Sequence, residues 1–103
     1  MSQFYFEVIK EYSSGNDCVR AIQLSLLSEQ EARANAIKML KTYKLTKGNG
    51  YVKVYSTNGS ADNYLGDVSA YHGKFVWLTY AYLNKGYLKG KQIDTKGRIG
   101  NPA

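Results

Sequence analysis

Apolar and polar residues alternate along the first part of the chain with the period of a β-strand. Within residues 3–12, every second position is apolar at Phe4, Phe6 and Val8. Successive side chains of a strand point to opposite faces, so this period indicates a strand with one buried face. We therefore predict a first strand over residues 3–12, followed by a turn in the small polar residues 13–17.

The next segment, residues 19–27, fits two patterns. Ile22, Leu24 and Leu26 alternate with polar residues, which indicates a strand. Val19, Ile22 and Leu26 also have the spacing of one helical face. We favour the strand, because a short turn after a first strand commonly leads into a hairpin.

The segment Ser28-Glu29-Gln30-Glu31 has the pattern of a helix N-terminus. The Ser28 hydroxyl can accept from a free amide of the first turn, and Glu31 can reach back to the Ser28 amide. We predict a helix over residues 29–44. Its buried stripe contains small and apolar residues, namely Ala32, Ala36, Met39, Leu40 and Tyr43, with Ile37 at the margin.

Three more strands are predicted after the helix, at residues 51–55, 64–71 and 74–83. The last of these, KFVWLTYAYL, contains the only tryptophan, Trp77, and is apolar on both faces near its centre. We expect an interior strand with a buried Trp77. The preceding Gly73 suits a tight hairpin turn. A short last edge strand would be anchored by Tyr87, Leu88 and Ile93.

This order of segments predicts one α+β domain over residues 1–94. We expect an antiparallel sheet of about five strands with one helix packed on one face, in the order β-β-α-β-β-β. Residues 95–103 are predicted to form a flexible basic tail. The sheet face without the helix is left for water, for a partner, or for a second copy in a homodimer.

Composition narrows the classes of function. The 103 residues carry a net charge of +6 with a pI near 9.4, which favours an acidic protein surface or nucleic acid as partner. The single cysteine, Cys18, excludes an internal disulfide, and the longest apolar runs are too short for a membrane span. We see no signal peptide and expect a cytoplasmic protein without a cofactor.

Tyrosines on the predicted helix-free face form the first candidate site. Tyr51, Lys53 and Tyr55 alternate with apolar valines, and Tyr80 and Tyr82 can join them. Exposed tyrosine rings can stack on unpaired bases while nearby lysines contact phosphates. This arrangement predicts a platform for single-stranded nucleic acid, although tyrosine is also common on strands that only face water.

Lysines form the second candidate site. Lys38, Lys41, Lys44 and Lys47 recur every three residues at the end of the predicted helix, and Lys89 and Lys91 lie in the Gly- and Lys-rich C-terminal segment. Such a ridge can neutralise backbone phosphates without reading sequence. The plain alternative is a solvated helix face.

Motifs for catalysis are weak. His72 is the only histidine and lies in a predicted turn, and residues 48–50 lack the pattern of a P-loop or dinucleotide fingerprint. Size, charge and tyrosine-rich strands resemble in composition the small accessory proteins of phages and mobile elements. We expect a non-enzymatic module that binds a polyanion, foremost single-stranded nucleic acid. The alternatives are an inhibitor or adaptor that docks on a nucleic-acid-processing protein, and a toxin-type ribonuclease that uses His72.

Overall fold

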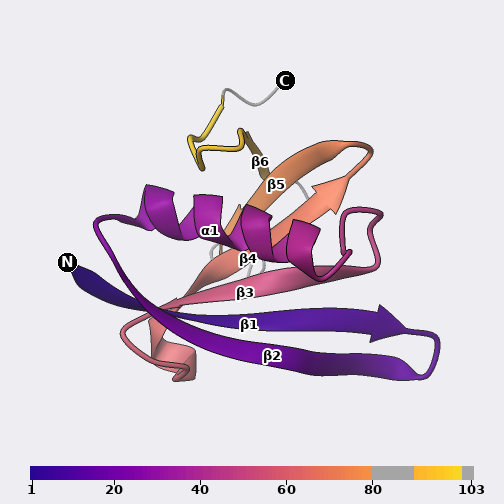
Figure 1. Cartoon of the computed structure of the whole chain (residues 1–103), viewed down its shortest axis with the longest axis horizontal. Coiled ribbons are helices and arrows are strands. Elements are labelled where there is room, and N and C mark those ends of the chain that lie inside the picture. Colours follow the sequence, from indigo (N-terminus) through magenta and orange to yellow (C-terminus); the bar gives the residue numbers. More distant parts are fainter. Residues whose placement is uncertain (80–89, 101–103) are drawn as a thin grey trace.

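The computed structural model describes residues 1–79 and 90–100. Within them, one α-helix packs on one face of a six-stranded antiparallel sheet with the strand order β2-β1-β3-β4-β5-β6 (Figure 1). The elements are β1 (Ser2–Tyr12), β2 (Gly15–Leu26), α1 (Glu29–Thr42), β3 (Gly50–Ser56), the short 3₁₀ helix η1 (Ala61–Asn63), β4 (Tyr64–Tyr71), β5 (Lys74–Thr79) and β6 (Lys91–Ile93).

The predicted α+β class and the order of the main elements are confirmed. The ambiguous residues 19–27 fall largely in β2, which pairs with β1 as a hairpin partner. The sheet has six strands where about five were expected, because the short β6 adds to the edge through Ile93. The predicted anchors Tyr87 and Leu88, and the end of the strand predicted over residues 74–83, lie outside the described residues.

The core lies between α1 and the sheet. Trp77 of β5 is 1% exposed, which confirms its predicted burial. Ala32 and Ala36 of α1 are fully buried, and their small side chains let the helix approach the sheet closely. The strand residues beneath the helix are mainly β-branched and aromatic, namely Phe4, Phe6, Val8, Val52, Val54 and Val68.

The N-terminus of α1 is capped almost as the sequence predicts. The Ser28 hydroxyl accepts a 3.2 Å hydrogen bond from the Glu31 amide. The Glu31 carboxylate accepts from the Leu27 amide at 2.6 Å, one residue before the predicted donor. Both bonds fix the direction in which the chain enters the helix.

The helix ends at Thr42, two residues earlier than predicted. Lys44 adopts a left-handed conformation with φ 59°, and its amide donates to the Lys41 carbonyl at 3.2 Å. The next amide, that of Leu45, donates to the Leu40 carbonyl at 2.8 Å. These two bonds form a Schellman motif, and the fully buried Leu45 is its apolar anchor.

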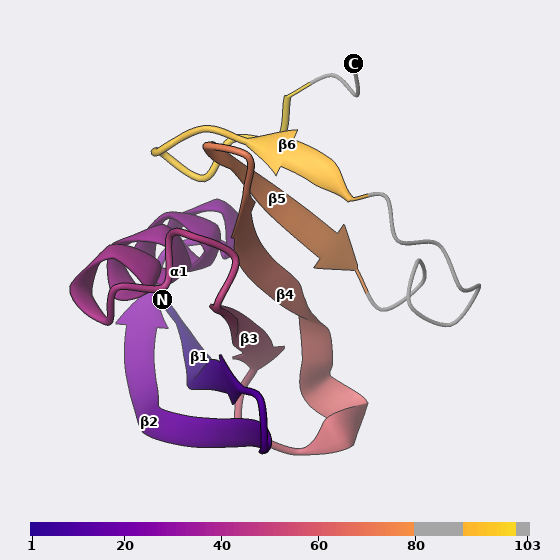
Figure 2. The same ribbon diagram turned by 90° about the vertical axis from the view of Figure 1, so that its right-hand side faces the viewer.

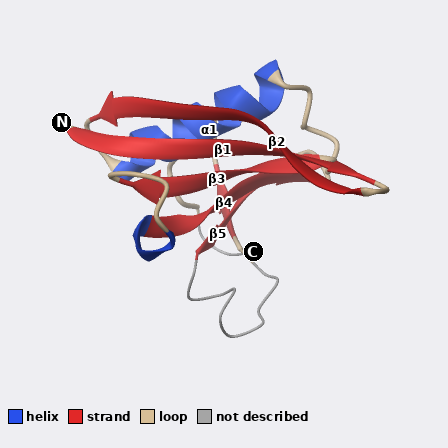
Figure 3. Cartoon of the chain, turned by 90° about the horizontal axis from the view of Figure 1, so that it is seen from below, coloured by secondary structure: helices blue, strands red, loops and turns tan. Residues whose placement is uncertain are grey.

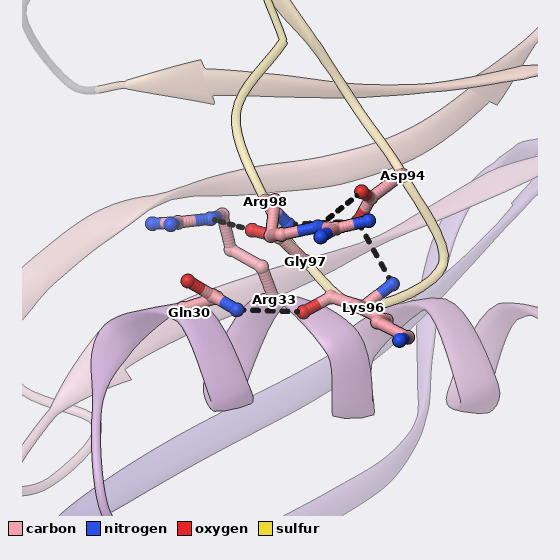
Figure 4. Close-up of polar contacts among 6 residues, drawn as sticks. All are labelled: Gln30, Arg33, Asp94, Lys96, Gly97 and Arg98. Carbon is pink, nitrogen blue, oxygen red and sulfur yellow. Dashed lines mark hydrogen bonds and ion pairs between the residues drawn. The ribbon is translucent and has the colours of Figure 1, made fainter.

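Residues 95–100, which we predicted as part of a flexible tail, lie against the helix in this structure (Figure 4). The Asp94 carboxylate accepts from the amides of Lys96 and Arg98, at 2.9 and 3.0 Å, and so closes a turn. Arg33 of α1 donates to the Gly97 carbonyl at 2.8 Å. The sequence did not indicate this contact, because an arginine inside a helix is usually exposed to water. Residues 101–103 lie outside the described part of the chain.

Candidate nucleic-acid interface

Figure 3 shows the sheet from below, with α1 on its far side. The predicted tyrosines of β3 belong to the sheet face opposite α1. Tyr51, Lys53 and Tyr55 share this face, because Val52 and Val54 between them point into the core. The prediction that all three are exposed is wrong. Tyr55 is only 5% exposed, and Tyr51 and Lys53 are half-buried. Tyr80 and Tyr82 lie outside the described residues.

The rings on this face pack against each other. The ring centroids of Tyr5 and Tyr55 are 5.6 Å apart at an interplanar angle of 65°, and those of Tyr55 and Tyr64 are 5.3 Å apart at 54°. Lys53 Nζ lies 5.3 Å from the Tyr64 ring centroid. A buried ring with neighbours of this kind has no free face for a base, so Tyr55 cannot serve as a stacking residue.

Strand register explains which residues meet on this face. Lys53 of β3 pairs with Glu7 of β1 on one side and with Asp67 of β4 on the other, so a basic residue is flanked by acidic residues on both neighbouring strands. The Tyr55 hydroxyl donates a 2.6 Å hydrogen bond to Glu7, and the Tyr64 hydroxyl donates to Asp67. We call these five residues the tyrosine clamp, because they tie β1, β3 and β4 together.

Burial changes the acidity of the clamp. It raises the pKa of Tyr55 and of Tyr64 far above their ordinary value, and the hydrogen bonds to Glu7 and Asp67 raise both pKa values further. Burial also raises the pKa of Asp67, while the Tyr64 hydrogen bond and the Lys53 charge lower it. Both hydroxyls therefore remain donors at neutral pH, as a structural network requires.

A loop covers one border of the same face. A Cβ atom on Gly59 would lie 2.6 Å from the Tyr5 ring, so the loop backbone sits directly against that ring. The Gln23 side chain of β2 holds the loop by donating to the Thr57 carbonyl at 2.9 Å. Tyr5 and Tyr55 are thus packed structural residues. The sequence could not show this, because the alternation of polar and apolar residues carries no information about which loop packs on a strand.

The predicted lysines lie together at the C-terminal end of α1. Lys38, Lys41, Lys44 and Lys47 are all exposed, and we call them the lysine surface. The last three, with Thr46, line a shallow hollow of about 430 Å³. Lys44 and Lys47 belong to the turn after the helix, so the turn brings them to one hollow. Lys89 lies outside the described residues, and Lys91 is half-buried in β6 opposite Trp77.

Within the described part of the chain, no acid neutralises this surface. The residues that the structure describes form two ion pairs, Arg33 with Glu29 and Arg98 with Asp94, and both use arginine. None of the four lysines of the lysine surface therefore has an acidic partner within ion-pair distance among these residues. Lys41 Nζ lies 5.7 Å from the centroid of the Phe75 ring, which places the helix end beside the start of β5.

Sequence reasoning missed the residues beside the lysine surface. The Glu11 amide donates to the Asn49 carbonyl at 2.9 Å, and a Cβ on Gly48 would lie 3.9 Å from the Ala70 carbonyl. The loop after α1 therefore runs between the end of β1 and the end of β4 (Figure 2). Four residues at strand ends and in the hairpin turn lie at this same end of the sheet, namely Tyr12, Tyr71, His72 and Lys74. Together with Lys44 and Lys47 we call them the turn end.

Aligning the ends of the predicted antiparallel strands would have located the turn end. The last residues of β1 and β4 and the first residue of β3 lie at the same end of the sheet. His72 occupies the tight turn there with φ 49°, followed by Gly73 with φ 77°. The described residues show its ring against Tyr71, with centroids 4.3 Å apart, and no hydrogen bond to a carboxylate. The geometry gives no support to a ribonuclease site.

Comparison with protein-family models, curated proteins and solved structures finds no significant match to this chain. Within the described residues, no cluster of three His, Cys, Asp or Glu side chains could hold a metal ion. None of the helices in that part of the chain has both the length and the apolar composition needed to cross a membrane. Function must therefore be inferred from the chemistry of the surface.

Proposed function

We propose that this protein is a non-enzymatic module that binds a polyanion through the lysine surface, with the phosphates of nucleic acid as its ligand. We assign it to the cytoplasm, where Cys18, an exposed free thiol, would stay reduced. No cofactor enters the proposal.

The observation that carries the proposal is the hollow formed by Lys41, Lys44 and Lys47, none of which pairs with an acid among the described residues. Ammonium groups gathered without counter-charges repel each other, and a polyanion relieves that repulsion. Its condensed cations are released on binding, which makes the affinity depend steeply on salt. The net charge of +6 adds long-range attraction to the same ligands.

The backbone of Lys44 also favours a functional role. Its left-handed conformation is the position where helices usually have glycine, because a Cβ there costs about 1–2 kcal/mol. The chain nevertheless has lysine at this position. Residues held in unfavourable conformations concentrate at functional sites. A lysine that contacts ligand would account for the retained strain.

A salt series of oligonucleotide titrations tests the proposal. We expect the logarithm of the association constant to fall linearly with the logarithm of salt concentration. The double variant Lys41→Gln with Lys47→Gln should reduce the slope by about two units, one for each phosphate that a lysine no longer neutralises. The matched control is Arg20→Gln with Lys96→Gln, which removes the same charge from exposed positions outside the lysine surface.

Two results would contradict the proposal. If the parent protein binds no polyanion at low salt, the proposed function is wrong. If the control changes the slope as much as the lysine-surface variant does, net charge alone drives binding and the lysine surface is not a site.

A second candidate, an inhibitor or adaptor that docks on another protein, is favoured by the edge of the sheet. Strand β2 is 12 residues long and, within the described sheet, hydrogen-bonds only to β1, so its outer edge offers backbone groups to an added strand. If no oligonucleotide binds, docking on another protein becomes the first candidate.

A homodimer through the face opposite α1 remains a prediction that sedimentation velocity can test.

A further inference from the structure

We propose that the outer edge of β2 pairs with the same edge of a second copy of this chain, so that the two sheets join into one in a symmetric dimer. The inference goes beyond the proposed function and does not depend on it. It also differs from a dimer through the face opposite α1, because it uses backbone groups at the border of the sheet.

The two edges of the sheet differ in how they are protected. At the β6 edge, the Gly100 amide donates to the Gln92 carbonyl at 2.8 Å, so the chain itself covers that edge. Within the described sheet, β2 hydrogen-bonds only to β1, and its other side is open (Figure 1). Proteins commonly block an open edge with lysine, proline or a bulge. Strand β2 has a bulge at Val19, but residues 21–27, AIQLSLL, contain neither a charge nor a proline.

The hydrogen bonds of β1 show which backbone groups of β2 point outward. Gln3 and Glu11 bond to residues that flank β3, so the odd-numbered residues of β1 direct their backbone groups toward β3. Alternate residues of a strand bond to opposite sides, so the even-numbered residues bond toward β2. There the register sets them opposite even-numbered residues. The N–H and C=O groups of Ala21, Gln23 and Ser25 therefore point away from the sheet.

This edge is complementary to itself. With a two-fold axis at Gln23, this residue lies opposite Gln23 of the second copy, and Ala21 lies opposite Ser25 of the second copy. Opposed residues of this kind exchange two hydrogen bonds, so the outward groups form about six bonds across the interface. Each residue then makes the same contact in both copies, as a symmetric dimer requires.

The side chains fit the same register. Ile22 lies opposite Leu24 of the second copy, and both side chains are half-buried and pack against the core of their own chain. Val19 and Leu27 are 38% and 70% exposed, and the axis brings Val19 of one copy level with Leu27 of the other. The segment 21–27 carries no charge, so two chains of net charge +6 meet there without opposed like charges. These matches favour a second copy over a strand of another protein.

Sedimentation velocity over a concentration series tests the dimer. We expect the parent to associate. Gln23→Lys places two ammonium groups opposite each other at the axis, and should raise the dissociation constant of the dimer at least about tenfold. Gln23→Met is the matched control, because it loses the same side-chain hydrogen bond to the Thr57 carbonyl but adds no charge. It should associate as the parent does.

Cross-linking tests the register in a Cys18→Ser background. Opposed residues of an antiparallel pair have Cα atoms about 5.5 Å apart, which is a suitable separation for a disulfide. Under mild oxidation, Gln23→Cys should form a covalent dimer. Ala21→Cys should not, because it lies opposite Ser25 and far from its own copy. A mixture of Ala21→Cys with Ser25→Cys should cross-link again.

Three results would overturn the inference. If the parent sediments as a monomer at every concentration, this edge does not pair with itself and stays open to a strand of another protein. If the parent is a dimer that Gln23→Lys leaves intact, the dimer uses another surface, such as the face opposite α1. If Ala21→Cys cross-links as readily as Gln23→Cys, the two-fold axis does not lie at Gln23. None of these results changes the salt series that tests the lysine surface.

Discussion

Arg33 Nε donates a 2.8 Å hydrogen bond to the carbonyl of Gly97, a residue 64 positions further along the chain. Arg33 is only 8% exposed, and its guanidinium lies 3.6 Å from the Glu29 carboxylate and 5.6 Å from the Trp77 ring centroid. Burial lowers the pKa of Arg33, and the Glu29 charge raises it in return. One side chain thus joins the helix, β5 and the docked C-terminal segment.

Replacing Gly97 should release this segment. A Cβ at Gly97 would collide with the Gln30 carbonyl and lie 2.7 Å from the Ala34 amide nitrogen, and the φ of 77° already disfavours a side chain. We expect Gly97→Ala to reduce the free energy of unfolding by more than the roughly 1–2 kcal/mol of backbone strain alone. Amide hydrogen exchange at residues 94–100 should become faster.

Gly73→Ala is the matched control, because Gly73 has the same φ of 77° with no atom within 4 Å of its added Cβ. It should show the backbone strain without the steric contact. Equal losses of stability in the two variants would mean that the segment is not pressed against α1.

The docked segment shows where sequence patterns stop being informative. Periodicity located β1, β2 and α1, because each buries one continuous face against the core. Residues 94–100 contain one large apolar residue, Ile99, which is exposed, and the segment is held by hydrogen bonds to backbone carbonyls, one of them from an arginine of a distant element. Such contacts leave no periodic trace, so composition alone suggested a mobile tail.

The tyrosine clamp predicts a loss of stability at high pH. Because the pKa of Tyr55 and of Tyr64 is raised in the folded state, the unfolded chain loses these protons first, near its ordinary tyrosine pKa of about 10. The stabilisation is complete below that pH and falls as pH rises further. We expect urea unfolding to show a declining free energy above about pH 10.

In the double variant Tyr55→Phe with Tyr64→Phe, the free energy of unfolding should fall less steeply over the same pH range. At neutral pH the loss of the Tyr55 bond to Glu7 should cost about 1.5 kcal/mol. Tyr12→Phe removes an exposed hydroxyl and serves as control. A double variant with the parent's pH dependence would show that the clamp does not hold these protons.

Trp77 should be the largest single contributor to the core. Trp77→Ala removes a fully buried indole together with its contact to the Arg33 guanidinium. We expect a loss of about 3–5 kcal/mol in urea unfolding, and blue-shifted fluorescence from the parent's indole. Tyr71→Ala, at an exposed position one strand away, should stay within about 0.5 kcal/mol of the parent. Emission typical of an indole in water would contradict the burial.

The candidate site could be predicted only in part, for a related reason. Helical spacing predicted that Lys38 to Lys47 would gather. Only Lys38 and Lys41 lie on α1, and the turn after the helix brings Lys44 and Lys47 to the same hollow as Lys41. It also placed Tyr51 and Tyr55 on one sheet face. It could not show that Glu7 and Asp67 would arrive from other strands and close that face, since register depends on the whole sheet. The exposed Tyr71 was overlooked because it ends a strand.

Lys44 gives the sharpest test, because stability and binding should change in opposite directions. Lys44→Gly relieves the strain at φ 59°, and after the added flexibility of the unfolded chain is subtracted it should raise the free energy of unfolding by about 0.5–1 kcal/mol. The same change removes one ammonium group from the hollow and should reduce the salt slope of oligonucleotide binding by about one unit. Lys44→Arg keeps both the charge and the strain, and should match the parent in urea unfolding and in the salt slope. If Lys44→Gly gains stability and binds as tightly as the parent, this lysine does not contact the ligand. If it gains no stability, the left-handed turn carries no strain, and the reason for keeping a lysine there disappears.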